Sequence, residues 1–277
     1  YAEEVIAKTR AYVQRNYPAP TLPDDPVFVF PDKDYPSYTD VRTLVELSGL
    51  EAITMSQARE RGYPQYTSII LSPEQPRIEP ISERAIWWSL EYGGEYEPDL
   101  SNWHGQVWSS DPAWAKAHNA KFVVMGSHPQ LANAVRELVT NTKQYDYLTL
   151  AYQTPRRQRV DMQLADLSTP KDPYPGYGVA RDEQLVNSKL MLHVHQRDDT
   201  HAIAPQRIAL AASYKLPLVC ESVPDAGAYG QFIPFVDYQH LNAEVRSQLA
   251  MLDVGIPQAR AEQLHQWLCV EHTFRKC

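Results

Sequence analysis

Apolar residues in this chain fall into two kinds of segment that follow one another. Residues 189–195, which read KLMLHVH, form a short apolar run and predict a buried strand with a polar carboxyl end. Residues 204–214 have apolar side chains at helical spacing, and Pro205 suits the first turn of a helix. Residues 216–220 are a second buried run, which ends at Glu221. Strand, polar loop, helix and strand together predict a right-handed βαβ unit.

The two kinds of segment alternate over nearly the whole chain. The expected strands are 27–30, 52–55, 67–71, 84–90, 106–108, 121–125, 146–151, 177–179, 189–195, 216–220 and 232–236. The expected helices are 2–16, 39–47, 57–61, one from 111, one that ends near 167, 182–188, 204–214, 241–252 and 256–274. This alternation predicts an α/β fold with mostly parallel sheets covered by helices. Because it restarts after a connecting segment, we expect two Rossmann-like domains, residues 1–142 and 143–277, facing each other across a cleft.

Composition and charge narrow the class of protein. The 277 residues carry a net charge of −8, which does not favour nucleic acid or an anionic membrane as a partner. No apolar run approaches the roughly 18 residues of a membrane span, and no signal peptide is recognised. The cysteines, Cys220, Cys269 and Cys277, lack the spacing of a metal site and fit a reducing compartment. We therefore expect a cytoplasmic protein without an integral membrane segment.

Polar residues gather where the strands of the βαβ unit end. In open α/β sheets, ligands bind beyond the carboxyl ends of the strands, and a helix N-terminus at that edge suits a phosphate. The residues at or near these ends are His193, His195, Asp198, Asp199, Thr200, His201 and Glu221. His193 and His195 fall on one strand face without an obvious third ligand, so we interpret them as structural or substrate-binding residues rather than zinc ligands. No G-x-G-x-x-G, Walker A or G-x-S-x-G motif accompanies them.

Three segments of the second half occur in an order that one enzyme family shares. Residues 146–152 with Arg156 and Arg157 form a strand and a basic loop, and residues 177–189 form a glycine-containing segment before a helix. Residues 191–219 follow as strand, loop, Arg207, helix and strand. In these features the chain resembles the nucleotide-binding domain of GT-B glycosyltransferases, most closely their diverged CgeB-like group. The first half is similar only in layout and in the strand ends IWWSLE and VVMGSHP.

The resemblance implies a glycosyltransferase that moves a sugar from a UDP- or GDP-sugar to a glycan or another acceptor, without a metal ion or cofactor. The donor diphosphate would lie against Arg156, Arg157 and Arg207, whose guanidinium groups make forked contacts to phosphate. Val179 and Arg181 would flank the base. His195, Asp199 and Thr200 would touch the sugar or the diphosphate. Tyr152, at the end of the basic segment's strand, completes the implied donor site.

An inverting transfer needs a general base beside the acceptor hydroxyl. Because the donor is assigned to the second domain, we expect the first domain to supply this base. Glu91 follows the strand at 84–90, and His128 follows the strand at 121–125, so both are catalytic candidates. The structural alternatives are a salt bridge at the strand end for Glu91 and a turn histidine before Pro129 for His128.

Many retaining members of the family carry two glutamates separated by seven residues, and this chain lacks them at the corresponding positions. The corresponding helix has Ala209 and Leu210 near the position of the second glutamate. The resemblance therefore implies an inverting or atypical site, or a protein without activity. The open alternatives are a non-catalytic protein that binds nucleotide sugars or glycans, a nucleotide-sugar epimerase, and a GT-A enzyme in which Asp32 and Asp34 would hold a metal.

Overall fold

The structure is a computed structural model, which describes residues 26–32, 39–62, 68–71, 84–90, 100, 103–132, 143–172 and 178–273. Within these ranges the chain is a mixed α/β protein built on two parallel sheets, as the sequence predicts. The expected helix at 2–16, the candidate base Glu91 and Asp34 lie outside them. No helix in the described ranges combines the length and the apolar character that crossing a membrane requires.

The first sheet has six strands in the order β2-β1-β3-β4-β5-β6, and each neighbouring pair is parallel. These strands are β1 Val27–Phe30, β2 Glu51–Thr54, β3 Ser68–Leu71, β4 Ile86–Ser89, β5 Gln106–Ser109 and β6 Lys121–Phe122. Helices α2 (Thr39–Leu47), α3 (Met55–Arg61) and α4 (Pro112–Ala117) accompany the sheet. The order is that of a doubly wound sheet, in which the order of strand addition reverses between β1 and β3.

Local sequence accounts for the limits of these helices. Thr54 accepts a hydrogen bond from the backbone N–H of Gln57, whose side chain accepts one from the N–H of Thr54, so α3 begins with a capping box. Gly62 ends α3 in the left-handed region, at a φ of 54°. Asp111 caps α4 through the N–H of Trp114 at 2.9 Å, and Pro112 occupies its first turn.

Aromatic side chains fill the core of the first sheet. Every residue of β1 and β4 is buried, as expected for parallel strands covered on both faces. Trp87 lies in the core on one side of the sheet and Trp88 in the core on the other. Burying a side chain of this size contributes roughly 4–6 kcal/mol by its area. The indole N–H of Trp88 donates to Ser110 Oγ at 3.0 Å, so its polar atom is satisfied.

The second sheet contains the parallel strands β7 (Met191–His193), β8 (Leu218–Glu221) and β9 (Phe235–Val236). Leu148 extends it beyond β7, because its N–H donates to Leu190 and its carbonyl accepts from Leu192. Of the strand expected at 146–151, only an isolated parallel bridge between Leu148 and Met191 forms. The backbone N–H groups of Asp146 and Tyr147 donate to the carbonyl of Ser168 rather than to a neighbouring strand.

Helices surround the second sheet. They are α5 Pro155–Gln163, α6 Val179–Asn187, α7 Pro205–Ser213, α8 Leu241–Ala250 and α9 Ile256–His265, with the 3₁₀-helices η4 Gly227–Gln231 and η5 Tyr238–His240 and the π-helix η6 Gln266–Glu271. The prediction of a strand at 177–179 is wrong at Val179, which begins α6. Gly178 precedes that helix at a φ of 89°, a conformation that glycine adopts without strain.

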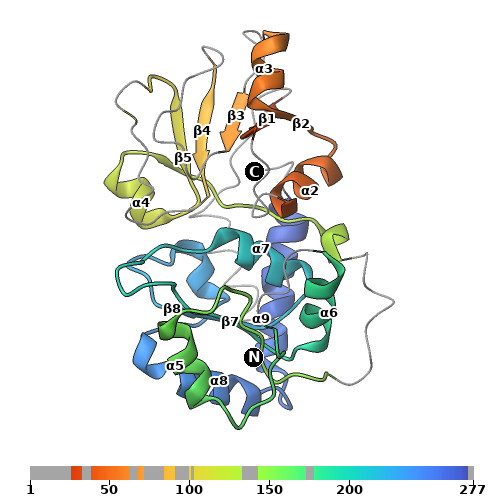
Figure 1. Ribbon diagram of the computed structural model, residues 1–277, viewed down its shortest axis with the longest axis vertical. Helices are drawn as coiled ribbons and strands as arrows, with labels where there is room; N and C mark the ends of the chain where they lie inside the picture. The colour runs from red at the N-terminus through yellow and green to blue at the C-terminus, as the bar shows by residue number, and fades with distance from the viewer. Residues whose placement is uncertain are drawn as a thin grey trace.

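The two sheets lie in two lobes, one above the other in Figure 1. We call β1–β6 with α2–α4 the first lobe, and β7–β9 with α5–α9 the second lobe. Helix α7 lies at their junction (Figure 1), where Ala209 packs into the core of the first lobe and Ile208 into that of the second. An ion pair of 2.6 Å between Arg181 and Asp40 also joins the lobes. The GT-B arrangement of the lobes remains a prediction.

Candidate functional site

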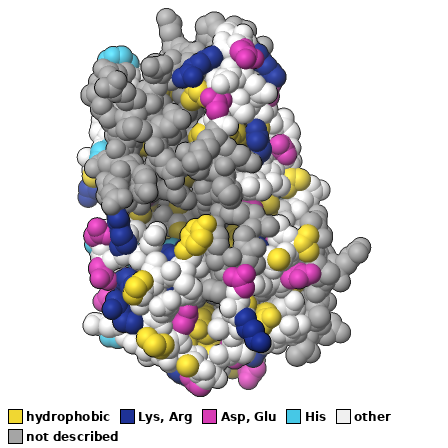
Figure 2. All heavy atoms as spheres, viewed as in Figure 1, with side chains coloured by type: hydrophobic (Ala, Val, Ile, Leu, Met, Phe, Trp, Pro, Cys, Tyr) yellow, Lys and Arg dark blue, Asp and Glu magenta, His cyan; other side chains and the backbone are white. Residues whose placement is uncertain are grey.

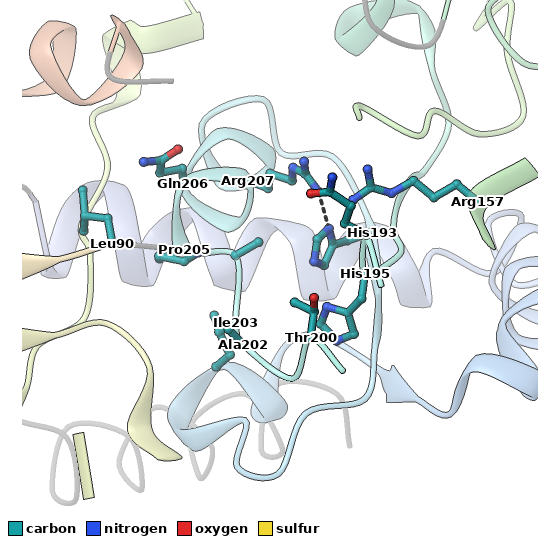
Figure 3. A pocket seen from close by; sticks show the side chains of 12 residues that line it. Leu90, Arg157, His193, His195, Thr200, Ala202, Ile203, Pro205, Gln206 and Arg207 are labelled. Carbon is teal, nitrogen blue, oxygen red and sulfur yellow. Dashed lines mark hydrogen bonds between the residues drawn. The ribbon is translucent and has the colours of Figure 1, made fainter. Parts of the chain in front are cut away.

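A cavity of about 190 Å³ lies at the junction, where β7 ends and α7 begins (Figure 3). Leu90, which directly follows β4, brings the carboxyl edge of the first sheet to the same cavity. The residues that line it are Leu90, Arg157, His193, His195, Gln196, Thr200, Ala202, Ile203, Ala204, Pro205, Gln206 and Arg207. These lining residues include two guanidinium groups and two imidazoles but no carboxylate, so the cavity suits an anion.

Arg157 is a buried cation with no carboxylate in direct contact. It lies in the first turn of α5, which Thr154 caps by accepting from the N–H of Arg157, and it is only 4% exposed. Its Nε donates to the carbonyl of Val194 at 3.0 Å and its Nη1 to that of Tyr152 at 2.8 Å. Across the described ranges, it forms no ion pair. Burial, followed by the charges of Arg207 and Arg156, lowers the pKa of Arg157 to about 9, and it therefore carries its charge at neutral pH.

Arg207 and His193 form a second polar contact in the cavity. Nη1 of Arg207, in the first turn of α7, donates to Nδ1 of His193, the last residue of β7, at 2.6 Å. Burial lowers the pKa of His193 well below its ordinary value, and the charges of Arg207, His195 and Arg157 lower it further. His193 is therefore neutral at physiological pH.

His195 lies beside His193, with the two ring centroids 5.4 Å apart and the ring planes at 90°. Its Nε2 lies 3.2 Å from the carbonyl of Ser222, and its backbone N–H donates to Glu221 at 2.9 Å. Burial lowers the pKa of His195, although the nearby carboxylate of Glu221 opposes this shift. Thr200 lines the same cavity, so the structure brings together Arg157, His195, Thr200 and Arg207 of the predicted donor site.

Arg156 does not line the cavity, because protein carboxylates bind its guanidinium group. Nη1 and Nη2 donate to the two oxygens of Glu221 at 2.6 and 2.5 Å, and Nε donates to Asp198 at 2.6 Å. The guanidinium carbon also lies 3.8 Å from the centroid of the Tyr238 ring. Arg156 therefore ties the loop after β7 to the end of β8 and to η5, and it supports the cavity from outside.

Four other predicted donor residues lie away from the cavity lining. Val179 is 60% exposed at the start of α6, and Tyr152 is 64% exposed, although its carbonyl holds Arg157. Asp199 is exposed and pairs with Arg197 at 3.1 Å. Arg181 is buried and pairs with Asp40 and Asp182, so its charge serves the contact between the lobes.

The structure does not bring His128 to the cavity. Its carbonyl lies 3.4 Å from the hydroxyl of Ser213, at the end of α7, whereas the cavity lies at the beginning of this 9-residue helix. At 1.5 Å per residue the two ends of α7 are roughly 12 Å apart. Burial lowers the pKa of His128, whose Nδ1 accepts from the N–H of Gln130. Asp32 accepts from the N–H of Ser56 in the first turn of α3.

Several cavity residues are missing from the donor site that the sequence predicts. The sequence gives His193 a structural or substrate-binding role only, although its position two residues before His195 places both rings on one face of the strand. Leu90, Gln196 and residues 202–203 carry no pattern that marks them as site residues, whereas residues 204–206 begin the helix whose N-terminus the sequence places at this edge. Leu90 reaches the cavity because the first lobe meets the second there.

Comparisons of the sequence with protein-family models and with curated proteins find no match. Inference about function therefore depends on the geometry and chemistry of this cavity.

Proposed function

We propose that this protein is a metal-independent glycosyltransferase whose nucleotide-sugar donor places its diphosphate in the junction cavity. The observation that carries the proposal is the buried charge of Arg157. Its contacts in the described structure are backbone carbonyls, and Arg207 and Arg156 add like charge nearby. Glu221 and Asp161 oppose these like charges through space, without a hydrogen bond to Arg157. A buried cation with no carboxylate in direct contact is unfavourable, so an anion in the cavity would stabilise it.

The first turn of α7 supports an anion at the same place. Pro205, Gln206 and Arg207 of that turn all line the cavity, and the helix begins without a side-chain cap. The first amides of a helix lack intrahelical acceptors, and the helix dipole favours negative charge beside them. Here Pro205 has no N–H and the N–H of Arg207 donates to the carbonyl of Ala204 at 3.1 Å, so Gln206 supplies the first-turn amide for an anion. Guanidinium groups from α5 and α7 would thus meet a diphosphate together with the dipole of α7.

The size of the cavity limits which part of the donor it would hold. Sites for whole small-molecule ligands usually have volumes of about 300–1,000 Å³. The cavity here, at about 190 Å³, would take the diphosphate and part of an adjoining sugar ring. The nucleoside would then extend beyond the described lining.

This placement suits the chemistry of sugar transfer. When the bond between the anomeric carbon and the diphosphate breaks, negative charge develops on the departing oxygen. Arg157 and Arg207 would stabilise that charge with guanidinium groups that hydrogen bonds already hold in place. Glu91 remains the candidate base, because it directly follows Leu90, which lines the cavity.

Calorimetry with UDP and GDP tests the proposal on the wild type and on Arg157→Ala. We expect one of the two nucleotides to bind the wild type, and the variant to bind it with an affinity lower by about 1.5–3 kcal/mol, the range for hydrogen bonds to charged groups. The matched control is Arg246→Ala, which removes an exposed arginine paired with Asp166 and should leave binding unchanged. Equal affinity of Arg157→Ala and the wild type would exclude the diphosphate from this cavity.

A non-catalytic protein that binds nucleotide sugars is the second candidate. The observation that favours it is that no carboxylate is present among the described lining residues, so none of them is a carboxylate base. Release of nucleoside diphosphate from a bound UDP- or GDP-sugar would support the transferase. Binding without release, with a range of acceptors present, would support the binding protein.

A further inference from the structure

In both cavity histidines, His193 and His195, the ring proton is on Nε2. His193 presents this protonated nitrogen to the cavity, whereas His195 presents its unprotonated Nδ1. A guanidinium group only donates hydrogen bonds, so Nδ1 of His193, 2.6 Å from Nη1 of Arg207, must accept. A neutral His193 therefore carries its proton on Nε2. This atom lies on the side of the ring that faces away from Arg207 and into the cavity (Figure 3). His193 thus offers the cavity a hydrogen-bond donor.

His195 has the opposite arrangement. A backbone carbonyl only accepts, so Nε2 of His195, 3.2 Å from the oxygen of Ser222, must carry a proton. In the neutral ring Nδ1 then has a free electron pair. The ring lines the cavity on the side of Thr200 (Figure 3). His195 thus offers the cavity a hydrogen-bond acceptor, 5.4 Å from the donor ring between centroids.

We propose that His193 and His195 form a neutral donor–acceptor pair that binds one hydroxyl group of the ligand, beside the arginines that bind its anionic part. A hydroxyl group can donate to one ring and accept from the other, whereas a phosphate oxygen can only accept. The pair therefore matches a sugar hydroxyl and disfavours phosphate at the same point. Arg207 is a positioning residue here, because it sets which nitrogen of His193 carries the proton. The inference rests on the proposed function, which places a phosphorylated sugar in this cavity.

Nitrogen NMR of the ¹⁵N-histidine-labelled protein tests the ring protons directly, without any ligand. At pH 7 we expect both rings to be neutral, with the proton on Nε2. Arg207→Met removes the guanidinium group that donates to Nδ1 of His193. His193 should then show a mixture of the two tautomers, while His195 keeps its proton on Nε2. A charged His193, or a His193 protonated on Nδ1 in the wild type, would overturn the inference.

Binding measurements test the hydroxyl group, with pyrophosphate, UDP and UDP-glucose as probes and the guanine series of GDP and GDP-mannose in parallel. For a hydroxyl-bearing probe, His193→Phe and His195→Phe should lose roughly three- to tenfold more affinity than they lose for pyrophosphate, the effect of one lost hydrogen bond. Any loss with pyrophosphate itself measures how far His193 positions Arg207. Loss already with UDP or GDP assigns the hydroxyl to the ribose, whereas loss only with the sugar nucleotides assigns it to the transferred sugar. His240→Phe, at an exposed position, is the control.

The outcomes separate the inference from the function on which it rests. If the variants lose the same affinity for pyrophosphate as for the hydroxyl-bearing probes, the donor–acceptor pair is wrong and the anion site stands. If the wild type binds none of the probes, both proposals fail. The variants His193→Asn, which keeps a donor, and His195→Gln, which keeps an acceptor, should recover part of the affinity and show that the loss does not come from misfolding.

Discussion

Two neighbouring regions of the second lobe bury arginines from the same turn of α5 and balance their charge differently. In the first region, Arg156 makes a two-pronged ion pair with Glu221 and a further contact with Asp198. In the second region, the junction cavity, Arg157 contacts only carbonyl oxygens within the described structure and lies near the like charge of Arg207.

The difference shows how a buried charge serves stability in one place and binding in the other. A buried ion pair with complete hydrogen bonding holds the segments that it joins, and losing one partner is costly. A buried cation without a directly paired carboxylate lowers the stability of the empty protein and favours an anionic ligand. The contacts of Arg156 therefore hold the loop after β7 in place. The charge of Arg157, which lines the cavity, is available to an anionic ligand.

The largest expected effect on stability comes from removing Arg156, whose charge is paired with Glu221 and Asp198. Arg156→Met leaves the buried carboxylate of Glu221 without its partner and should lower the free energy of unfolding by about 3–5 kcal/mol. Arg157→Met should lower the free energy of unfolding by clearly less than Arg156→Met does, because it removes a charge that burial already disfavours. Urea denaturation of the two variants measures the difference. Equal losses would show that the two arginines have the same structural role, and the comparison would fail.

The next effect concerns the cavity. Arg207→Ala should weaken the binding of a nucleoside diphosphate by about 1.5–3 kcal/mol, because it removes a cation from the wall that would face the anion. Titration calorimetry measures it. The control Lys215→Ala removes an exposed lysine that pairs with Glu262 and should bind like the wild type. Unchanged binding in Arg207→Ala would remove this residue from the anion site.

The buried histidines make stability depend on pH in the acidic range. The pKa of His193 is lowered in the folded state, so below about pH 6.5 the unfolded chain binds a proton that the folded protein does not. The free energy of unfolding should therefore fall by up to about 1.4 kcal/mol per pH unit as the pH drops below 6.5. Urea denaturation at pH 7.5 and 5.5 should show a weaker dependence in His193→Phe. A dependence equal to that of the wild type would contradict a neutral, buried His193.

The smallest effect is expected at His128, which lies at the far end of α7 from the cavity. His128→Ala should change the affinity for a nucleoside diphosphate by less than about 0.5 kcal/mol, as for most substitutions away from a site. It should also leave turnover unchanged if transfer is observed, whereas Glu91→Gln should lower it. A loss of turnover in His128→Ala alone would return this residue to the catalytic candidates.

The parallel sheets could be predicted because their signal is local. Continuous apolar runs such as residues 27–30 and 216–220 have few ways to satisfy both burial and backbone hydrogen bonding, and the strands form within or next to them. Pro205 and the apolar spacing after it likewise placed α7 within one residue at each end. The strand expected at 177–179 is wrong because Gly178, at a φ of 89°, directly precedes a helix that begins at Val179, and the apolar pattern does not indicate this conformation.

Amino-acid order alone determined the α/β class, the βαβ unit and the group of polar residues at its strand ends, since each of these follows from spacing over a few residues. It left Arg156 and Arg157 equivalent, as adjacent arginines in one helical turn. Only the tertiary structure decided between them, because one side chain meets Glu221 from β8 and the other meets carbonyls beside a cavity that the first lobe closes. The environment of a charge depends on groups distant in the chain, and burial makes that environment decisive.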